Sequence, residues 1–119
     1  MSASSLNQSI TVSIVIPCFN HGQYIQEALD SIDHQKINYN TQVIIVDDGS
    51  TDDGTLQKLE ELKKLNYTVI HQTNGGPGKA RNTGIEKATG QYILPLDADN
   101  KIHHSKEYPS VIKLPIVKK

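Results

Sequence analysis

The 119-residue chain carries a net charge of −1 and a hydrophobic fraction of 36%, values that suit one compact domain. These values argue against a protein that binds nucleic acid or anionic membranes, and against a disordered chain. One cysteine, Cys18, argues against an internal disulfide and a cysteine-rich zinc site. The apolar runs are too short to span a bilayer, and residues 1–10 form a polar lead-in without the pattern of a signal peptide. Composition therefore predicts a soluble, cytoplasmic protein.

The first half of the chain predicts two strands, each followed by a helix. Residues 11–17 (TVSIVIP) are a β-branched run that ends at proline, and residues 41–47 (TQVIIVD) are a second apolar run. Between them, five apolar residues fall on one helical face: Tyr24, Ile25, Ala28, Leu29 and Ile32. After the second strand, N-cap residues and a three-residue step of leucines predict another helix: Ser50, Asp52, Asp53, Leu56, Leu59, Leu62 and Leu65.

The second half continues this alternation. Residues 67–71 (YTVIH) predict a short third strand, residues 79–88 a third helix, and residues 91–96 (QYILPL) a fourth strand. Residues 74–78 (NGGPG) predict a loop, because glycine and asparagine adopt turn conformations at low cost. Strands that alternate with helices predict an α/β fold of three layers, α/β/α, around a mostly parallel sheet.

Acidic residues follow two of the predicted strands. Asp47 and Asp48 end the second strand, and Asp97 and Asp99 follow the fourth. Because parallel strands end at the same edge of the sheet, we expect these carboxylates to converge there. Carboxylates in one crevice repel each other unless a cation or hydrogen-bond donors offset their charge, and Mg²⁺ or Mn²⁺ bound between carboxylates and a diphosphate would do so. Alternatively, Asp47 is buried against backbone partners.

The glycine-rich loop at residues 74–78 differs from two well-known phosphate-binding motifs. A P-loop has Ser or Thr after its Gly-Lys pair, whereas Ala80 follows Gly78 and Lys79 here. A dinucleotide-binding fingerprint has a third glycine where Arg81 stands. The loop leads into a helix N-terminus with two basic side chains, which suits an anionic group. The alternative is a helix-initiating turn whose basic residues are solvated.

Histidine and cysteine do not predict a metal site or a nucleophile. The five histidines are either scattered or adjacent, so they cannot share one helical face: His21, His34, His71, His103 and His104. Cys18 follows the first strand without a histidine at an activating spacing, so a packed, unreactive thiol is expected.

Four motifs occur in an order that resembles the N-terminal part of the family 2 glycosyltransferases, which have the GT-A fold. They are residues 13–20 (SIVIPCFN), 46–52 (VDDGSTD), 74–84 (NGGPGKARNTG) and 96–100 (LDADN), within a matched region of residues 11–102. The resemblance implies the Rossmann-like, nucleotide-sugar-binding half of a GT-A fold. It also implies an enzyme that transfers a sugar from a nucleotide sugar to an acceptor hydroxyl, generally with inversion.

The first two motifs supply the base-binding residues that this resemblance implies. Pro17, Phe19 and Asn20 line the nucleotide pocket, with the ring of Phe19 stacked on the base. Asp48 accepts a hydrogen bond from the uracil N–H, an interaction that favours a UDP-sugar.

The last two motifs supply the remaining site residues. Gly78 and Arg81 lie near the base and ribose, and Asp97 approaches the ribose or the metal. Asp99 holds Mn²⁺ or Mg²⁺ against the diphosphate. The acceptor is a saccharide, a lipid or a protein, and the enzyme is cytoplasmic, either free or at the cytoplasmic face of a membrane.

The chain departs from the family pattern after residue 102. Family members continue well past the D-x-D triplet, and that region supplies the acceptor site and the general base. Here residues 103–119 form a basic tail whose sole carboxylate, Glu107, stands in no family motif, so no catalytic base is identified. The sequence thus predicts a truncated domain over residues 11–102 that self-associates through exposed apolar surface. A module that binds UDP and a metal without transferring sugar remains the alternative.

Two other families place acidic residues after a strand and are disfavoured. A haloacid-dehalogenase-like phosphatase has Thr or Val where Lys101 stands and needs a long downstream domain. A phosphoacceptor receiver domain has its paired acids after the first strand, whereas here they follow the second.

Overall fold

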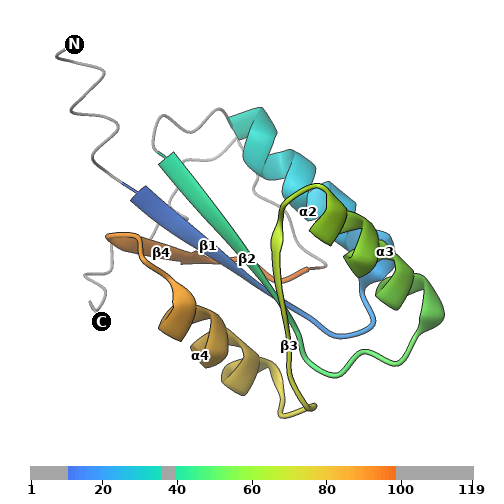
Figure 1. Ribbon diagram of the computed structural model, residues 1–119. Helices are drawn as coiled ribbons and strands as arrows, with labels where there is room; N and C mark the ends of the chain where they lie inside the picture. Colours follow the sequence, from blue (N-terminus) through green and yellow to red (C-terminus); the bar gives the residue numbers. More distant parts are fainter. Residues whose placement is uncertain (1–10, 36–39, 99–119) are drawn as a thin grey trace, which may run out of the picture.

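The computed structural model describes residues 11–35 and 40–98. Within them, strands and helices alternate as predicted (Figure 1). The elements are β1 (Thr11–Cys18), α2 (Gly22–Gln35), β2 (Asn40–Asp47), α3 (Asp53–Lys64), β3 (Thr68–His71), α4 (Pro77–Lys87) and β4 (Tyr92–Pro95). The predicted lead-in at 1–10, the basic tail at 103–119 and Asp99 lie outside the described residues. No helix in the described ranges is long and apolar enough to cross a membrane.

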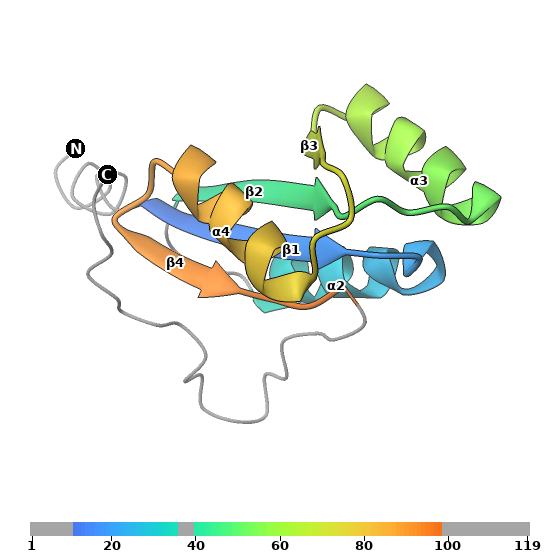
Figure 2. The same cartoon turned by 90° about the horizontal axis from the view of Figure 1, so that it is seen from below.

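The strands form one parallel sheet in the order β3-β2-β1-β4, which confirms the predicted fold class. β1 lies between β2 and β4, and each of its residues from Val12 to Cys18 is buried. The chain first extends the sheet from β1 to β3 and then returns to add β4 on the other side of β1. The strand order therefore reverses between β1 and β4, the position where ligands bind in open α/β sheets. The carboxyl ends of β1, β2 and β4 point the same way (Figure 2).

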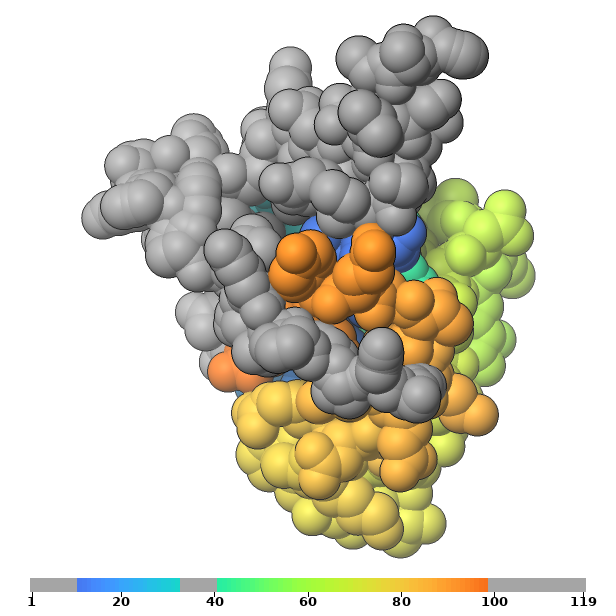
Figure 3. Space-filling view, turned by 90° about the vertical axis from the view of Figure 1, so that its left-hand side faces the viewer, coloured from blue at the N-terminus to red at the C-terminus, as the bar shows by residue number. Residues whose placement is uncertain are grey.

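Helices cover both faces of the sheet. Successive residues of β1 point to opposite faces, so Ile14 and Ile16 pack toward α2 and α3 while Val15 packs toward α4. The cluster on the α2 and α3 face also includes Ile25, Leu29, Ile45, Leu59 and Leu62, and the cluster on the α4 face also includes Ile44, Val46, Ala80, Ala88 and Ile93. In the space-filling view of Figure 3, α4 and the residues that lead into β4 are yellow to orange and α3 is green. Each face of the sheet thus packs on its own apolar core.

Two helices differ in detail from the prediction. In α3, Leu59 and Leu62 are buried, whereas Leu56 and Leu65 are 37% and 66% exposed. A three-residue step falls short of a 3.6-residue turn, so the ends of such a row rotate away from the core. Helix α4 begins at Pro77 instead of residue 79, because proline lacks the N–H that the first helical turn leaves unpaired.

Gly84 sets the distance between α4 and the sheet. It is a buried residue of α4, and a Cβ atom built on it would overlap Cγ1 of Val15 and lie 3.2 Å from Cγ2 of Val46. The helix backbone therefore packs directly on β1 and β2. Because α4 carries Arg81, this contact also fixes the position of the Arg81 backbone relative to the strand ends.

We predict that Gly84→Ala destabilises the protein by about 1–3 kcal/mol, because the added methyl group must displace α4 or Val15. Gly54→Ala in α3 is the matched control, since its Cβ would meet only Oδ2 of Asp52 at 3.5 Å. It should leave stability unchanged or raise it by up to about 1 kcal/mol. Urea unfolding measures both changes, and the double variant Val15→Ala/Gly84→Ala should lose less stability than the sum of its two single variants, because the smaller side chain relieves the overlap. Equal effects of the two glycine substitutions would contradict the close packing.

Candidate functional site

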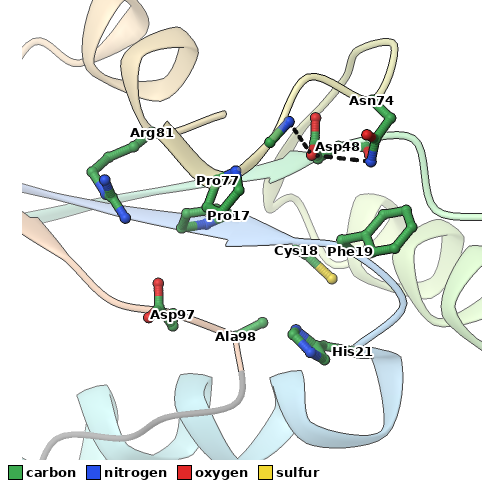
Figure 4. Close-up of a pocket in the computed structure, with 11 residues that line it drawn as sticks. Pro17, Cys18, Phe19, His21, Asp48, Asn74, Pro77, Arg81, Asp97 and Ala98 are labelled. Atoms are coloured by element: carbon green, nitrogen blue, oxygen red, sulfur yellow. Dashed lines mark hydrogen bonds between the residues drawn. The ribbon is translucent and has the colours of Figure 1, made fainter. Parts of the chain in front are cut away.

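A cavity of about 520 Å³ lies at the carboxyl ends of the strands, beside the start of α4 (Figure 4). Its volume falls in the range of small-molecule pockets, and it lies where the strand order reverses. Five residues that the sequence predicts for the site line this cavity: Pro17, Phe19, Asp48, Arg81 and Asp97. Asn20 and Gly78 are not among the lining residues, and Asp99 lies outside the described residues.

Six further residues line the cavity and were not singled out as ligand contacts by the sequence: Cys18, His21, Asn74, Gly76, Pro77 and Ala98. Asn74, Gly76 and Pro77 belong to the glycine-rich loop, so the motif itself pointed to them. Cys18 and Ala98 likewise lie within the motifs at residues 13–20 and 96–100, whereas His21 lies in none of the four motifs. Cys18 is the last residue of β1, and His21 and Ala98 lie in the segments that follow β1 and β4.

Asp48 is buried and holds the glycine-rich loop in place. Its Oδ1 accepts hydrogen bonds from Nε2 of Gln72 and the N–H of Gly75, each at 2.8 Å. Its Oδ2 accepts from the N–H of Gly76 at 3.0 Å and from Nδ2 of Asn74 at 3.3 Å. The Asn74 amide also donates to the Asp48 carbonyl oxygen at 2.9 Å, which fixes the orientation of that amide. The carboxylate therefore joins the end of β2 to the loop that starts α4.

The pKa of Asp48 is lowered despite its burial. Burial by itself raises the pKa, because it disfavours the charged form. Hydrogen bonds from Gln72, Gly75 and Gly76, together with the positive charge of Lys79, stabilise the carboxylate and outweigh burial. The ionised form is thus the one that organises the loop at neutral pH.

Asn20 ties together the loops that follow β1 and β2. Its Oδ1 accepts hydrogen bonds from the N–H of Thr51 at 2.8 Å and of Asp52 at 3.0 Å, and its own N–H donates to Oγ of Ser50 at 2.9 Å. Its backbone is left-handed, with φ of 55°, a conformation that asparagine tolerates better than most residues. The resemblance assigns Asn20 to ligand binding, whereas its side-chain oxygen already accepts two hydrogen bonds from the loop that follows β2.

Asp52 and Asp47 have structural partners, in line with the alternatives considered for them. Asp52 is the N-cap of α3, and its Oδ2 accepts from the N–H of Thr55 at 3.0 Å. Asp47 is buried, and its carboxylate accepts from the N–H of Ser50 at 2.9 Å and lies 2.8 Å from Nδ1 of His71. Neither residue lines the cavity.

Cys18 is a packed thiol, as expected from the sequence. It is 1% exposed, and burial together with the nearby charge of Asp47 raises its pKa to about 11, although a hydrogen bond with the backbone of His21 opposes this change. A thiol with this pKa carries almost no thiolate at neutral pH and is a poor nucleophile.

Three side chains that line the cavity are free to contact a ligand. The ring of Phe19 is 42% exposed. The guanidinium of Arg81 and the carboxylate of Asp97 enter from α4 and from the segment after β4, and neither has a hydrogen-bond or ion-pair partner among the described residues (Figure 4). Within residues 11–35 and 40–98, no cluster of three or more His, Cys, Asp or Glu is arranged to hold a metal. Asp97 nevertheless suits Mg²⁺ or Mn²⁺, which bind one or two carboxylates plus phosphate oxygens.

We predict that Asn20→Ala destabilises the protein by about 3 kcal/mol. This value combines about 1 kcal/mol for each hydrogen bond that Oδ1 accepts with about 1 kcal/mol for a left-handed alanine. Asn20→Gly removes the same hydrogen bonds without the left-handed penalty, so it should cost about 1 kcal/mol less. Urea unfolding of the three proteins measures these differences, and a glycine variant less stable than the alanine variant would contradict the assignment.

We also predict that Asp48→Asn destabilises the fold in a pH-dependent way. The folded-state pKa of Asp48 is lowered, so its stabilising effect is present above the unfolded pKa of about 3.9 and is lost as pH falls through the folded pKa. The gap in unfolding free energy between the wild type and the variant should be largest above about pH 5 and shrink below about pH 4. Urea titrations from neutral to acidic pH test this, and a gap that stays constant across the range would count against it.

Comparison with known proteins identifies the family of this chain. The family model described as Glycosyl transferase family 2 matches residues 13–114. The poly(ribitol-phosphate) beta-glucosyltransferase of Bacillus spizizenii is 44% identical over 96 residues, which cover 76% of this chain and 15% of that protein. The chain spans between 15% and 30% of the length of the curated relatives compared with it.

Solved structures agree in fold. Residues 1–349 of Staphylococcus aureus TarS in complex with UDP-GlcNAc match with a TM-score of 0.65 and 39% identity, over 79% of this chain and 28% of that one. The mannosyltransferase PcManGT from Pyrobaculum calidifontis, in complex with GDP-Man and Mn²⁺, matches with a TM-score of 0.62 and 30% identity, over 74% and 27% of the two chains. These neighbours are GT-A enzymes. The chain belongs to glycosyl transferase family 2.

Proposed function

We propose that this chain binds a nucleoside diphosphate sugar, with a UDP-sugar as the donor, and acts as the donor-binding part of a glycosyltransferase. One observation carries the proposal. A cavity at the switch point of the sheet contains an exposed aromatic ring, an unpaired guanidinium and an unpaired carboxylate, from Phe19, Arg81 and Asp97, among the described residues. These groups match a base, an anionic diphosphate and a metal or ribose, and the TarS structure named above contains UDP-GlcNAc.

The base would lie between Phe19 and the loop that Asp48 organises. An exposed aromatic ring gives a nucleobase a flat surface for stacking. The carboxylate of Asp48, kept ionised by its donors, would accept the imide N–H of uracil. All four lone-pair sites of that carboxylate have protein donors, so a uracil N–H would replace or share the longest of these contacts, Nδ2 of Asn74 at 3.3 Å.

The diphosphate would lie toward Arg81 and Asp97. The guanidinium can donate to phosphate oxygens in a bidentate manner, and Gly76 and Pro77 place the start of α4 at the same cavity. Asp97, with Asp99 from the same D-x-D triplet, would hold Mn²⁺ or Mg²⁺. A bound divalent cation would neutralise the charge of the diphosphate leaving group.

The reaction proposed is transfer of the sugar to an acceptor hydroxyl, generally with inversion. The acceptor is a saccharide, a lipid or a protein. A general base has to remove the hydroxyl proton. We assign no residue of this chain to that role.

We predict that UDP binds the chain and that Mn²⁺ strengthens this binding by about tenfold or more, because a metal between Asp97, Asp99 and the diphosphate removes charge repulsion. Titration calorimetry with UDP, with and without Mn²⁺, measures the effect. Asp97→Asn and Asp99→Asn should each remove most of the gain from Mn²⁺. CDP should bind more weakly than UDP, because cytosine has no imide N–H for Asp48 to accept.

Asp53→Asn is the matched control, because Asp53 is an exposed residue of the first turn of α3 and does not line the cavity. It should leave the response to Mn²⁺ unchanged. If UDP binding gains nothing from Mn²⁺ and the Asp97 and Asp99 variants behave like the Asp53 variant, the metal assignment is wrong. Release of UDP from UDP-GlcNAc and other UDP-sugars, with saccharide acceptors, then separates a transferase from a module that only binds.

A further inference from the structure

Gln72 joins two parts of the proposed site without lining the cavity itself. It directly follows β3, and its N–H donates to the Asp47 carbonyl oxygen at 2.9 Å, which extends the sheet by one residue. Its side chain then bridges two elements. Nε2 donates to Oδ1 of Asp48 at 2.8 Å, and Oε1 accepts from Oγ1 of Thr83 on α4 at 2.6 Å.

The chemistry of its partners fixes the orientation of the Gln72 amide. An ionised carboxylate only accepts hydrogen bonds, so the NH₂ group has to face Asp48 and the carbonyl oxygen has to face Thr83. The Thr83 hydroxyl has one proton and two candidate acceptors, Oε1 of Gln72 at 2.6 Å and the Lys79 carbonyl oxygen at 3.0 Å. The shorter contact is the one to Gln72.

This bridge fixes the relative positions of two parts of the proposed site, the Asp48 carboxylate and helix α4. On one side, Asp48 holds Gly75 and Gly76 through its two carboxylate oxygens. On the other side, Thr83 belongs to the same helix as Arg81, which lines the cavity. A glutamine with both ends engaged thus sets the carboxylate and the basic helix at a fixed separation.

We propose that Gln72 is a positioning residue of the nucleotide site, which holds the Asp48 carboxylate and helix α4 in the geometry that binds the donor. The inference rests on the proposed function, since it concerns the same pocket. Its partner Thr83 is the second member of the bridge, and neither residue needs to touch the ligand.

The first test compares Gln72→Met with Gln57→Met by UDP calorimetry on the 119-residue chain. Methionine is similar in size to glutamine but makes neither hydrogen bond. Gln57 lies on the exposed side of α3, away from the cavity, so its substitution is the same chemical change at a neutral position. Gln72→Met should weaken UDP binding by about tenfold, the loss that one charge-assisted hydrogen bond accounts for. Gln57→Met should leave binding unchanged.

Thr83→Val and Thr83→Ser form a second pair that spares Gln72. Valine is isosteric with threonine but has no hydroxyl, so it should weaken UDP binding by severalfold. Serine keeps the donor and should retain wild-type affinity. In Gln72→Met, amide exchange at Gly75 and Gly76 should accelerate while exchange in β1 stays slow, because the hydrogen bonds to Asp48 loosen without loss of the sheet.

Gln72→Glu gives a readout that a general loss of stability would not reproduce. At neutral pH the introduced carboxylate would face the Asp48 carboxylate and repel it. At lower pH the two groups would share a proton and regain a hydrogen bond. The ratio of wild-type to variant affinity for UDP should therefore fall as pH is lowered from about 8 to about 5.5.

The outcomes separate the inference from the function on which it rests. If the wild-type chain does not bind UDP, the proposed function fails and the inference fails with it. If the wild type binds but Gln72→Met and Gln57→Met have equal affinities, only the inference is overturned. A pH-independent ratio for Gln72→Glu, or a Thr83→Ser variant as weak as Thr83→Val, would also overturn it. Circular dichroism and urea midpoints confirm that each variant is folded.

Discussion

The carboxylate of Asp48 accepts hydrogen bonds from four donors that lie between Gln72 and Gly76, and the shape of the pocket depends on these contacts. A glycine-rich segment has little side-chain packing to hold it, and Gly76 has a positive φ of 99°. Without a fixed acceptor its backbone N–H groups would have many arrangements available. One buried, ionised group at the end of β2 selects a single arrangement and thereby places the first turn of α4.

Polar residues at the strand ends divide into two groups by what they contact. Asn20, Asp47 and Asp52 bond to backbone N–H groups of neighbouring loops or helices, and they do not line the cavity. Phe19, Arg81 and Asp97 line the cavity with exposed or unpaired groups among the described residues. The first group gives the pocket a fixed shape, because buried or bridging polar atoms are costly to leave unpaired. The second group keeps its binding capacity for a ligand.

The topology of the sheet explains where the pocket lies. β1 is central and buried, and its last residues, Pro17 and Cys18, pair with Val46 and Asp47 of β2, so Phe19 follows a well-supported strand end. Helix α4 packs closely on β1 through Gly84 and brings Arg81 to the same edge. The segment after β4 brings Asp97 from the other side of β1. Three segments that are far apart in the sequence thus meet at the point where the strand order reverses.

The sequence by itself determined the alternation of strands and helices, the parallel sheet and the family, because β-branched runs, helical periodicity and ordered motifs are local signals. Through the resemblance of its motifs it also indicated five of the residues that line the cavity, Pro17, Phe19, Asp48, Arg81 and Asp97. Only the tertiary structure decided which polar atoms are already occupied. The side-chain hydrogen bonds of Asn20 and Gln72 join residues about 10 to 30 positions apart, and no local pattern specifies such pairs. The same limit applied to the exposed ends of the leucine row in α3, because burial depends on what packs against each turn of a helix.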